Sequence, residues 1–306
     1  MTPDVEKHLA CLETRSLIIQ AIRDFFTDSG YLEVETPVLC PSIIPEAQIE
    51  PVNIGNNYLQ ASPELCMKRL LSKGFDKIFQ ICKCFRKNER GPRHLPELTL
   101  LEWYTRDHTY LDLMDQCQAL IRFIIQKLAF EIPLHYQGRA IHFSSPWPRL
   151  TVKNAFQKYS DTDVFTALET NRFDEIISFE IEPCLENITT PVFLCDYPAS
   201  QASLSKLLPG NSDCAQRFEL YISGIEIANG FTELNDPEEQ ALRFEKENQI
   251  RISMNKPPVS VPKKFLEDLK TMPEAAGIAL GVDRLVMILC NAKTIDEVIT
   301  FPPEQL

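Results

Sequence analysis

The amino-acid sequence predicts an α+β fold in which an antiparallel β-sheet is flanked by helices. Two strand–loop–strand segments, residues 78–104 and 217–230, favour neighbouring antiparallel strands. Apolar residues recur at helical spacing in residues 5–28 and 109–129, as expected for helices packed on a sheet. The length of 306 residues fits two domains or one large one. We expect a single domain over residues 1–306.

Composition narrows the class of protein. Hydrophobic residues make up 44% of the chain and charged residues 24%, which is ordinary for a globular protein. No apolar run reaches membrane-spanning length and no secretory signal precedes the first helix, so we expect a cytoplasmic protein with no membrane partner. The ten cysteines follow no disulfide or zinc spacing. The net charge of −12 argues against a broad nucleic-acid surface, but it allows a local cationic pocket.

The N-terminal residues predict a helix followed by a strand. Leu9, Leu12, Ile19, Ile22 and Phe26 form the apolar stripe of a helix over residues 5–28 that ends at Gly30. Residues 31–37 then alternate as a strand that closes on a proline. A helix–strand corner with no functional role fits this pattern as well as a corner that has one.

A second helix is predicted from Ser62 to Lys73. Ser62 is suited to cap it, Pro63 to occupy its first turn, and Gly74 to stop it. Glu64 in the first turn complements the helix dipole, which alone explains its presence.

Residues 78–85 and 98–104 read as two β-strands joined by a charged loop that Gly91 and Pro92 punctuate. An arginine at the end of a strand, followed by more cations on a loop, can bind a polyphosphate, because guanidinium grips phosphate oxygens as a fork. A solvated hairpin tip is the simpler alternative. The charged residues of this loop are Arg86, Lys87, Glu89, Arg90, Arg93 and His94.

The middle of the chain carries structural signals and little recognisable chemistry. Thr109 and Asp112 form a capping box for a helix that runs to about Ala129. Residues 131–190 read as an inserted helical and loop region, which we expect to be a variable flap. A strand over residues 191–197 leads into the string PASQASL at residues 198–204.

Residues 217–230 predict a β-hairpin that turns at Ser223 and Gly224. The regular register of this turn places Tyr221 opposite Glu226 and Glu219 opposite Ala228. Glu219, Tyr221 and Glu226 then share one face, with the two glutamates roughly 7 Å apart at their α-carbons. Such a pair suits Mg²⁺ held together with ATP oxygens. A solvent-facing acidic stripe is the alternative.

Two further segments follow the hairpin. The string NGFTELND at residues 229–236 leads into a helix over residues 236–254, and Glu233 within the string can be a plain surface acid. Residues 277–285 read as a strand running into a helix that has Arg284 near its start. Glycines at 277 and 281 let the backbone approach a ligand closely.

These segments together resemble the three motifs of the class II aminoacyl-tRNA synthetases, most closely the lysyl branch. The pattern F-R-x-x-E…R-H-x-P-E-x-T-x-L-E-W-Y is similar to motif 2, the N-terminal helix and strand to motif 1, and residues 277–285 to motif 3. The strings SPE and NGFTEL are similar to lysyl sequences. The PASQASL string and Ala279 resemble the truncated lysyl paralogues that join (R)-β-lysine to elongation factor P. The resemblance covers nearly the whole chain.

The resemblance implies a class II synthetase catalytic core, a homodimer built on motif 1, and the use of ATP and Mg²⁺. It implies catalytic roles for Arg86 and Arg284, and Mg²⁺ ligation by Glu219 and Glu226. The implied ATP-binding residues are Arg86, Lys87, Asn88, Glu89, His94, Leu95, Leu98, Glu226, Ile227, Gly281 and Arg284. The implied residues for lysine or β-lysine are Ser62, Pro63, Glu64, Glu102, Tyr104, Asn229, Glu233 and Ala279.

The chain departs from the family pattern at three positions. Asn88 stands where the family has Glu, and Glu89 follows one residue later. Leu98 replaces a Phe that stacks on adenine, at a cost of roughly 1 kcal/mol. Ala279 stands where tRNA-charging enzymes have Gly, and an extra methyl in a pocket is worth roughly 1–3 kcal/mol of discrimination. The segment similar to motif 1 begins within the first few dozen residues, so we expect no anticodon-binding domain before it.

The function that these features predict is ATP-dependent ligation. The enzyme would activate (R)-β-lysine as an adenylate and transfer it to a lysine side chain of elongation factor P, without anticodon recognition. A minimal lysine-activating enzyme with another acceptor is a second hypothesis. A catalytically silent, synthetase-like regulatory subunit is a third.

Overall fold

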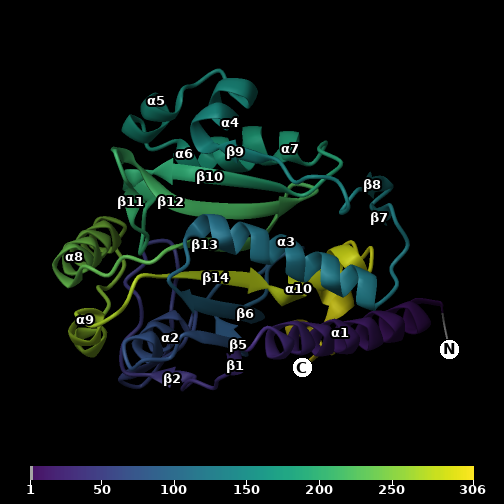
Figure 1. The fold of residues 1–306 in the computed structure, drawn as a ribbon, viewed down its shortest axis with the longest axis horizontal. Coiled ribbons are helices and arrows are strands. Elements are labelled where there is room, and N and C mark those ends of the chain that lie inside the picture. Colours follow the sequence, from purple (N-terminus) through teal and green to yellow (C-terminus); the bar gives the residue numbers. More distant parts are fainter. Residues whose placement is uncertain (1–2) are drawn as a thin grey trace.

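The computed structural model describes residues 3–306, and its elements surround one large central sheet (Figure 1). The helices are α1 (Pro3–Asp28), α2 (Glu64–Leu71), α3 (Tyr110–Lys127), α4 (Val152–Tyr159), α5 (Val164–Glu169), α6 (Phe173–Ile176), α7 (Glu182–Leu185), α8 (Pro237–Ser253), α9 (Lys263–Leu269) and α10 (Val282–Leu289). The strands are β1 (Leu32–Glu33), β2 (Leu39–Cys40), β3 (Val52–Ile54), β4 (Asn57–Leu59), β5 (Lys77–Phe85), β6 (Glu97–Arg106), β7 (Leu134–Tyr136), β8 (Arg139–Ile141), β9 (Arg149–Thr151), β10 (Val192–Pro198), β11 (Leu207–Leu208), β12 (Asn211–Ile222), β13 (Ile225–Thr232) and β14 (Ala275–Gly281).

The central sheet has nine strands in the order β1-β5-β6-β14-β13-β12-β10-β9, with β11 added against β12. All pairs from β5 to β10 are antiparallel, and only the two ends of this order, β1 on β5 and β9 on β10, pair in parallel. The predicted α+β class with an antiparallel sheet flanked by helices is therefore confirmed.

The main hydrophobic core joins the sheet to α1, α3 and α10. Asp283 at the start of α10 links this layer to the sheet and to the N-terminus. Its carboxylate accepts the backbone N–H of Thr99 at 2.7 Å and pairs with Arg15 of α1 at 2.6 Å. Since Asp283 is only 2% exposed, this buried link fixes α10, and the Arg284 that follows, relative to β6.

The N-terminal helix forms as predicted, and Gly30 ends it with a left-handed φ of +76°. The predicted strand over residues 31–37 is too long. Only Leu32 and Glu33 pair, in parallel with β5, because the chain leaves the sheet edge after a last backbone bond from Val34 to Phe79. The helix after Ser62 is also shorter than predicted, since α2 starts at Glu64 and ends at Leu71.

Residues 131–190 form a packed substructure with helices α4–α7 and three short strands. Strand β9 extends the central sheet by pairing with β10. Buried side chains of the helices, among them Phe156 and Ile176, share a second core with Leu194 of β10. Helices α4–α7 of this region lie as a layer beside β10 at one end of the sheet (Figure 1).

The predicted hairpin forms, and both turn residues have positive φ, 49° at Ser223 and 68° at Gly224. Tyr221 lies opposite Glu226 as predicted. The predicted pairing of Glu219 with Ala228 is wrong, because Glu219 pairs with Asn229. A β-bulge at Ile227 adds one residue to β13 and shifts the register beyond it.

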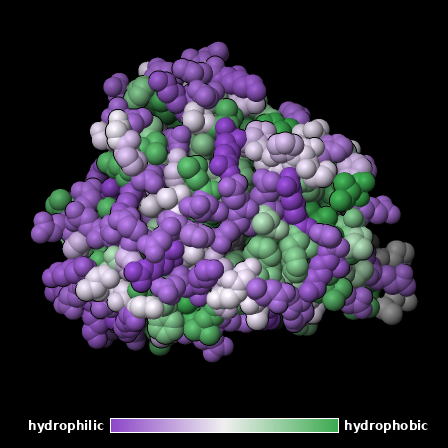
Figure 2. All heavy atoms as spheres, viewed as in Figure 1, coloured by the Kyte–Doolittle hydropathy of each residue, from purple (hydrophilic) through white to green (hydrophobic). Residues whose placement is uncertain are grey.

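None of the helices in the described part of the chain is both long and apolar enough to cross a membrane. On the face of the molecule shown in Figure 2, hydrophilic residues predominate and hydrophobic residues form small groups.

Candidate active site

A cavity of about 530 Å³ opens on the face of the sheet formed by β6, β14, β13 and β12. Fifteen of the predicted site residues line it. They are Ser62, Glu64, Arg86, Glu89, His94, Leu95, Leu98, Glu102, Tyr104, Glu226, Ile227, Asn229, Ala279, Gly281 and Arg284. Five predicted residues lie outside its wall, namely Pro63, Lys87, Asn88, Glu219 and Glu233.

Arg86 follows the last residue of β5 and is well placed to bind an anion. Its backbone N–H donates to Pro96 across the hairpin at 2.9 Å, which fixes the start of the side chain. The nearest carboxylate, Glu89, lies 3.7 Å from Nη1, so the ion pair is loose. The buried Nε–H has no hydrogen-bond partner among the described residues. The cation therefore keeps donors free for a ligand. Asn88 is exposed at the loop tip with φ of +66°.

Arg284 connects motif 3 to motif 2 and to β13 through its contacts with His94 and Glu226. One of its nitrogens, Nη1, donates to the backbone carbonyl and the carboxylate of Glu226, at 2.9 and 3.1 Å. The Nη2 group lies 2.7 Å from His94 Nε2, which must accept, since guanidinium only donates. Burial, and then the Arg284 charge, lower the pKa of His94, so the imidazole is neutral. Arg284 is thus fixed at the cavity wall.

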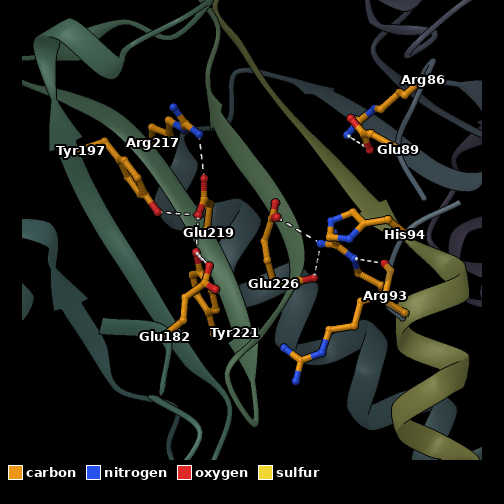
Figure 3. Close-up of polar contacts among 11 residues, drawn as sticks. Arg86, Glu89, Arg93, His94, Glu182, Tyr197, Arg217, Glu219, Tyr221 and Glu226 are labelled. Carbon is orange, nitrogen blue, oxygen red and sulfur yellow. Dashed lines mark hydrogen bonds and ion pairs between the residues drawn. The ribbon is translucent and has the colours of Figure 1, made fainter. Parts of the chain in front are cut away.

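Glu219 and Glu226 occupy neighbouring positions but have different partners (Figure 3). Both oxygens of Glu219 accept hydrogen bonds, Oε1 from Arg217 at 2.7 Å and Oε2 from Tyr197 and Tyr221 at 2.6 and 2.7 Å. Burial, and then the Glu226 charge, raise the pKa of Glu219. Burial acts in the same sense on Glu226, but Arg284, with Arg86 and Arg217, outweighs it, and together they hold the pKa of Glu226 below its usual value. Glu226 is therefore ionised at the cavity.

These carboxylates match the chemistry of a Mg²⁺ site only in part. Within residues 3–306, no group of three or more His, Cys, Asp or Glu side chains is close enough to hold a metal alone. Mg²⁺ commonly binds through one or two carboxylates, together with water and substrate phosphates. Glu226 can bind Mg²⁺ directly. Glu219 lies behind the wall and would have to exchange a tyrosine hydrogen bond for the metal. The donor set fits Mg²⁺ bound jointly with a nucleotide.

Lys68, which sequence reasoning missed, lies at the other end of the cavity. Its ammonium is 1% exposed and lies 2.5 Å from a carboxylate oxygen of Glu64 and 2.5 Å from one of Glu233. Glu233 is fully buried and lies behind the cavity wall. Lys68 pairs with Oε2 of Glu233, whereas the buried Oε1 has no hydrogen-bond partner among the described residues and faces the space left at Gly277, so contact of Glu233 with a substrate ammonium stays a prediction. The i, i+4 spacing of Glu64 and Lys68 in α2 is a signal that could have found the pair.

Glu102 is a buried carboxyl between Ser62 and Tyr104. Ser62 Oγ donates to Oε1 at 2.5 Å and Tyr104 Oη to Oε2 at 2.8 Å. Ser62 also accepts the backbone N–H of Glu64 at 3.0 Å, which ties α2 to β6. Burial, and then the Glu64 charge, raise the pKa of Glu102 to about 8. A ligand ammonium placed here would gain an anionic partner and restore the charged form.

The floor of the cavity depends on cross-strand register. Ala279 of β14 lies between Glu102 of β6 and Asn229 of β13. Two residues earlier, Gly277 leaves space that no other residue could, because a Cβ there would meet Tyr104 at 2.2 Å and Glu233 at 2.4 Å. Arg217, also missed, lines the cavity and lies 3.3 Å from the Asn229 amide oxygen. Strand alternation from Glu219 places Arg217 on the same face and could have identified it.

The sheet order and the cavity define a class II synthetase catalytic core. The model of the family described as tRNA synthetases class II (D, K and N) matches residues 4–305, and the chain belongs to this family. The chain is 36% identical to the lysine–tRNA ligase of Magnetococcus marinus, with 95% of this chain and 63% of that protein covered. It therefore spans less than two thirds of that relative.

Two other relatives are covered almost completely. The elongation factor P–(R)-β-lysine ligase of Pectobacterium carotovorum is 37% identical, with 97% of this chain and 96% of that protein aligned. The protein of the same name from Mannheimia succiniciproducens is also 37% identical, with 95% and 94% aligned.

The buried carboxyl at Glu102 predicts a pH dependence of stability. A carboxyl whose folded pKa is raised from 4.5 to about 8 binds its proton more tightly in the folded state. Its stabilising contribution is complete below pH 4.5 and is lost as the pH rises towards 8, by at most about 1.4 kcal/mol per pH unit. In Glu102→Gln, the free energy of unfolding should fall less steeply over this range. Urea unfolding at several pH values measures the slope. Glu169→Gln, at an exposed position, should match the unsubstituted protein, whereas parallel slopes for Glu102→Gln would contradict the assignment.

Proposed function

We propose that this protein is an ATP-dependent ligase that activates (R)-β-lysine as an aminoacyl adenylate and transfers it to a lysine side chain of elongation factor P. The observation that carries the proposal is the division of one cavity into two ends. Arg86, which has an unpartnered donor, and Arg284 lie at one end, and buried carboxyl groups lie at the other. Support for the acceptor comes from the relatives with that name, which align over 94% and 96% of their length. A cytoplasmic location follows from this acceptor.

At the cationic end, Arg86 and Arg284 would bind the phosphates of ATP. Mg²⁺, when bound through Glu226 and Glu219, would neutralise phosphate charge. The carboxylate of the amino acid attacks the α-phosphorus, its new P–O bond forms, and pyrophosphate leaves with the electrons of the broken P–O bond. No protein nucleophile is required. The side chains contribute by positioning the reactants and by stabilising the charge that develops on the phosphate.

At the acidic end, Glu64, Glu102 and Tyr104 would bind an ammonium of the substrate. A buried ammonium needs an anionic partner because it loses its hydration. Lys68 pairs with Glu64 and Glu233, and burial raises the pKa values of Glu233 and Glu102 to about 8, so a substrate ammonium bound here would favour the ionised carboxylates. Glu233 holds Lys68 through Oε2 and would offer its unpartnered Oε1 to the same substrate ammonium.

We also propose that the protein is a homodimer that associates through α1 and β1. Large apolar side chains are exposed along this part of the chain, including Val5 at 50%, Leu17 at 56% and Leu32 at 52%. An exposed apolar strip on a helix is typical of a subunit interface.

Replacing Arg86 with Ala should lower amino-acid-dependent pyrophosphate exchange at least 100-fold, because its contact strengthens as charge develops at the α-phosphate. The loss should appear in kcat rather than only in KM. Arg90→Ala is the matched control, since Arg90 belongs to the same loop but pairs with Asp296 and Glu304 outside the cavity. Exchange that persists in Arg86→Ala would remove Arg86 from the phosphate site.

The methyl group of Ala279 should favour β-lysine over α-lysine. It occupies the cavity floor beside Asn229 and Glu102, where an α-amino group needs space and a β-amino group branches one carbon further along. Ala279→Gly should raise kcat/KM for α-lysine relative to (R)-β-lysine about tenfold, if about 1.4 kcal/mol of crowding is relieved. Pyrophosphate exchange with both substrates measures the ratio. An unaltered ratio would leave Ala279 as a packing residue.

The proposed dimer predicts that Leu17→Glu shifts sedimentation at micromolar concentration from dimer to monomer, because a carboxylate would be buried at the interface. Phe179→Glu serves as the control, since Phe179 is 77% exposed on the inserted region, away from α1. A monomer in the unsubstituted protein would exclude the dimer without affecting the fold.

A further inference from the structure

A second cavity of about 300 Å³ adjoins the active-site cavity. It lies between the loop over residues 44–46, the segment after β10, and α8. Four residues, Glu46, Ser200, Ser203 and Glu247, line both cavities. The second cavity therefore adjoins the first across these residues, and nothing in the adenylation step uses it.

An unsatisfied amide indicates that this cavity is built for a ligand. Gln240 of α8 lines it and is 1% exposed, yet neither its amide oxygen nor its amide nitrogen has a hydrogen-bond partner among the described residues. A buried polar group without a partner destabilises the fold, so such groups call for a specific role. Apolar side chains complete the wall beside it, those of Leu204, Leu207, Leu242 and Phe244.

The charges of the cavity favour a cationic guest. Glu46, Glu239 and Glu247 line it. Of its two cations, Arg243 is already engaged by Glu239 at 2.9 Å and by the carbonyls of Ser203 and Ser205, and Lys246 lies at the exposed rim. Apolar walls with acids at the inner end suit an alkyl chain that carries an ammonium, which describes a lysine side chain.

Glu46 is held at the junction by its backbone, while its carboxylate stays unused. Arg251 of α8 donates to the Glu46 carbonyl at 2.9 Å, and Glu247 accepts the N–H of Ala47 at 2.9 Å. Among the described residues, none hydrogen-bonds to or pairs with the Glu46 carboxylate. Burial, and then Glu64 of α2, raise its pKa to about 7. Glu247 of α8 adds to this, and Arg86 after β5 and Arg217 of β12 oppose it. A base for neutral pH has such a pKa.

We propose that the second cavity admits the lysine side chain of the acceptor protein and that Glu46 takes a proton from its ammonium. This inference rests on the proposed ligase function and assigns the route and the base of its second step. The neutral amine attacks the carbonyl carbon of the adenylate and forms a C–N bond. The C–O bond to the phosphate breaks, and AMP leaves with that electron pair. One proton of the ammonium goes to Glu46, and the second goes to the phosphate of AMP.

The free amino acid is the other alkyl ammonium that could enter the second cavity. Measuring adenylate formation and transfer separately distinguishes the free amino acid from the acceptor lysine. Pyrophosphate exchange with (R)-β-lysine reports adenylate formation. Single-turnover transfer to elongation factor P reports the acceptor. Hydroxylamine is small and already neutral at pH 7. It therefore traps the adenylate without needing a base or the second cavity.

Three variants test the proposal through the ratio of transfer rate to exchange rate. Glu46→Gln should lower the ratio at least tenfold and remove a rise of the transfer rate with pH through about 7. Leu242→Lys, which adds a cation to the wall of the second cavity, should raise KM for the acceptor about tenfold. Gln240→Met should raise the Tm, because it removes the buried amide that has no hydrogen-bond partner. It should also raise KM for the acceptor protein. Leu111→Lys, at a position 44% exposed on α3, should change neither half-reaction.

Three outcomes would overturn the inference. The first is a ratio unchanged in both Glu46→Gln and Leu242→Lys. The second is a fall in exchange that matches the fall in transfer, which would assign the cavity to the free amino acid. The third is loss of hydroxylamine trapping together with transfer in Glu46→Gln. Failure of the ligase function itself appears differently, as absent (R)-β-lysine-dependent exchange in the unsubstituted protein.

Discussion

The ammonium of Lys68, buried between Glu64 and Glu233, is the interaction on which the substrate end of the cavity depends. Burial disfavours its charge, but Glu233 and then Glu64 outweigh that cost and raise the pKa of Lys68 above its usual value. Without this cation, three carboxyl groups, including Glu102, would face one another at low dielectric, and two of them would lose their charge. Even with it, burial raises the pKa values of Glu102 and Glu233 to about 8. The protein thus supplies one cation and leaves the place of a second to the substrate.

The β-bulge at Ile227 connects this acidic end to the phosphate end. In a regular strand, Glu226 and Asn229 would point to opposite faces, because they are an odd number of residues apart. The extra residue brings both to the cavity, where Glu226 contacts Arg284 and Asn229 contacts Arg217. Beyond the bulge, Asn229 pairs with Ala279 of β14, which in turn pairs with Glu102 of β6. Both ends of one substrate can therefore be held by adjacent strands of a rigid sheet.

Features that depend on neighbouring residues were predictable from the sequence. Strand register and contacts between distant segments were not. The Ser223–Gly224 turn, the Thr109–Asp112 capping box and the stop at Gly30 each rest on a few neighbouring residues, and all three form. The bulge leaves no mark in the alternation of residues 225–232, so the register beyond it was mispredicted. Lys68 reads as a surface residue of a short helix until β13 brings Glu233 against it. The role of β9 as a sheet edge depends on β10, some forty residues later in the chain.

Adenylate formation and transfer place different demands on the cavity. The transfer step gives a reason for the Glu46 carboxylate, which adenylate formation does not use. In the first step the nucleophile is a carboxylate, ionised at neutral pH, so positioning and positive charge suffice, and the arginines provide both. In the second step the nucleophile arrives as an ammonium, which has no lone pair until it loses a proton. A base is then required, outside the phosphate site so that it does not repel ATP, yet within reach of the carbonyl carbon. The proposed base, Glu46, is on a loop tied to α8 and lines both cavities.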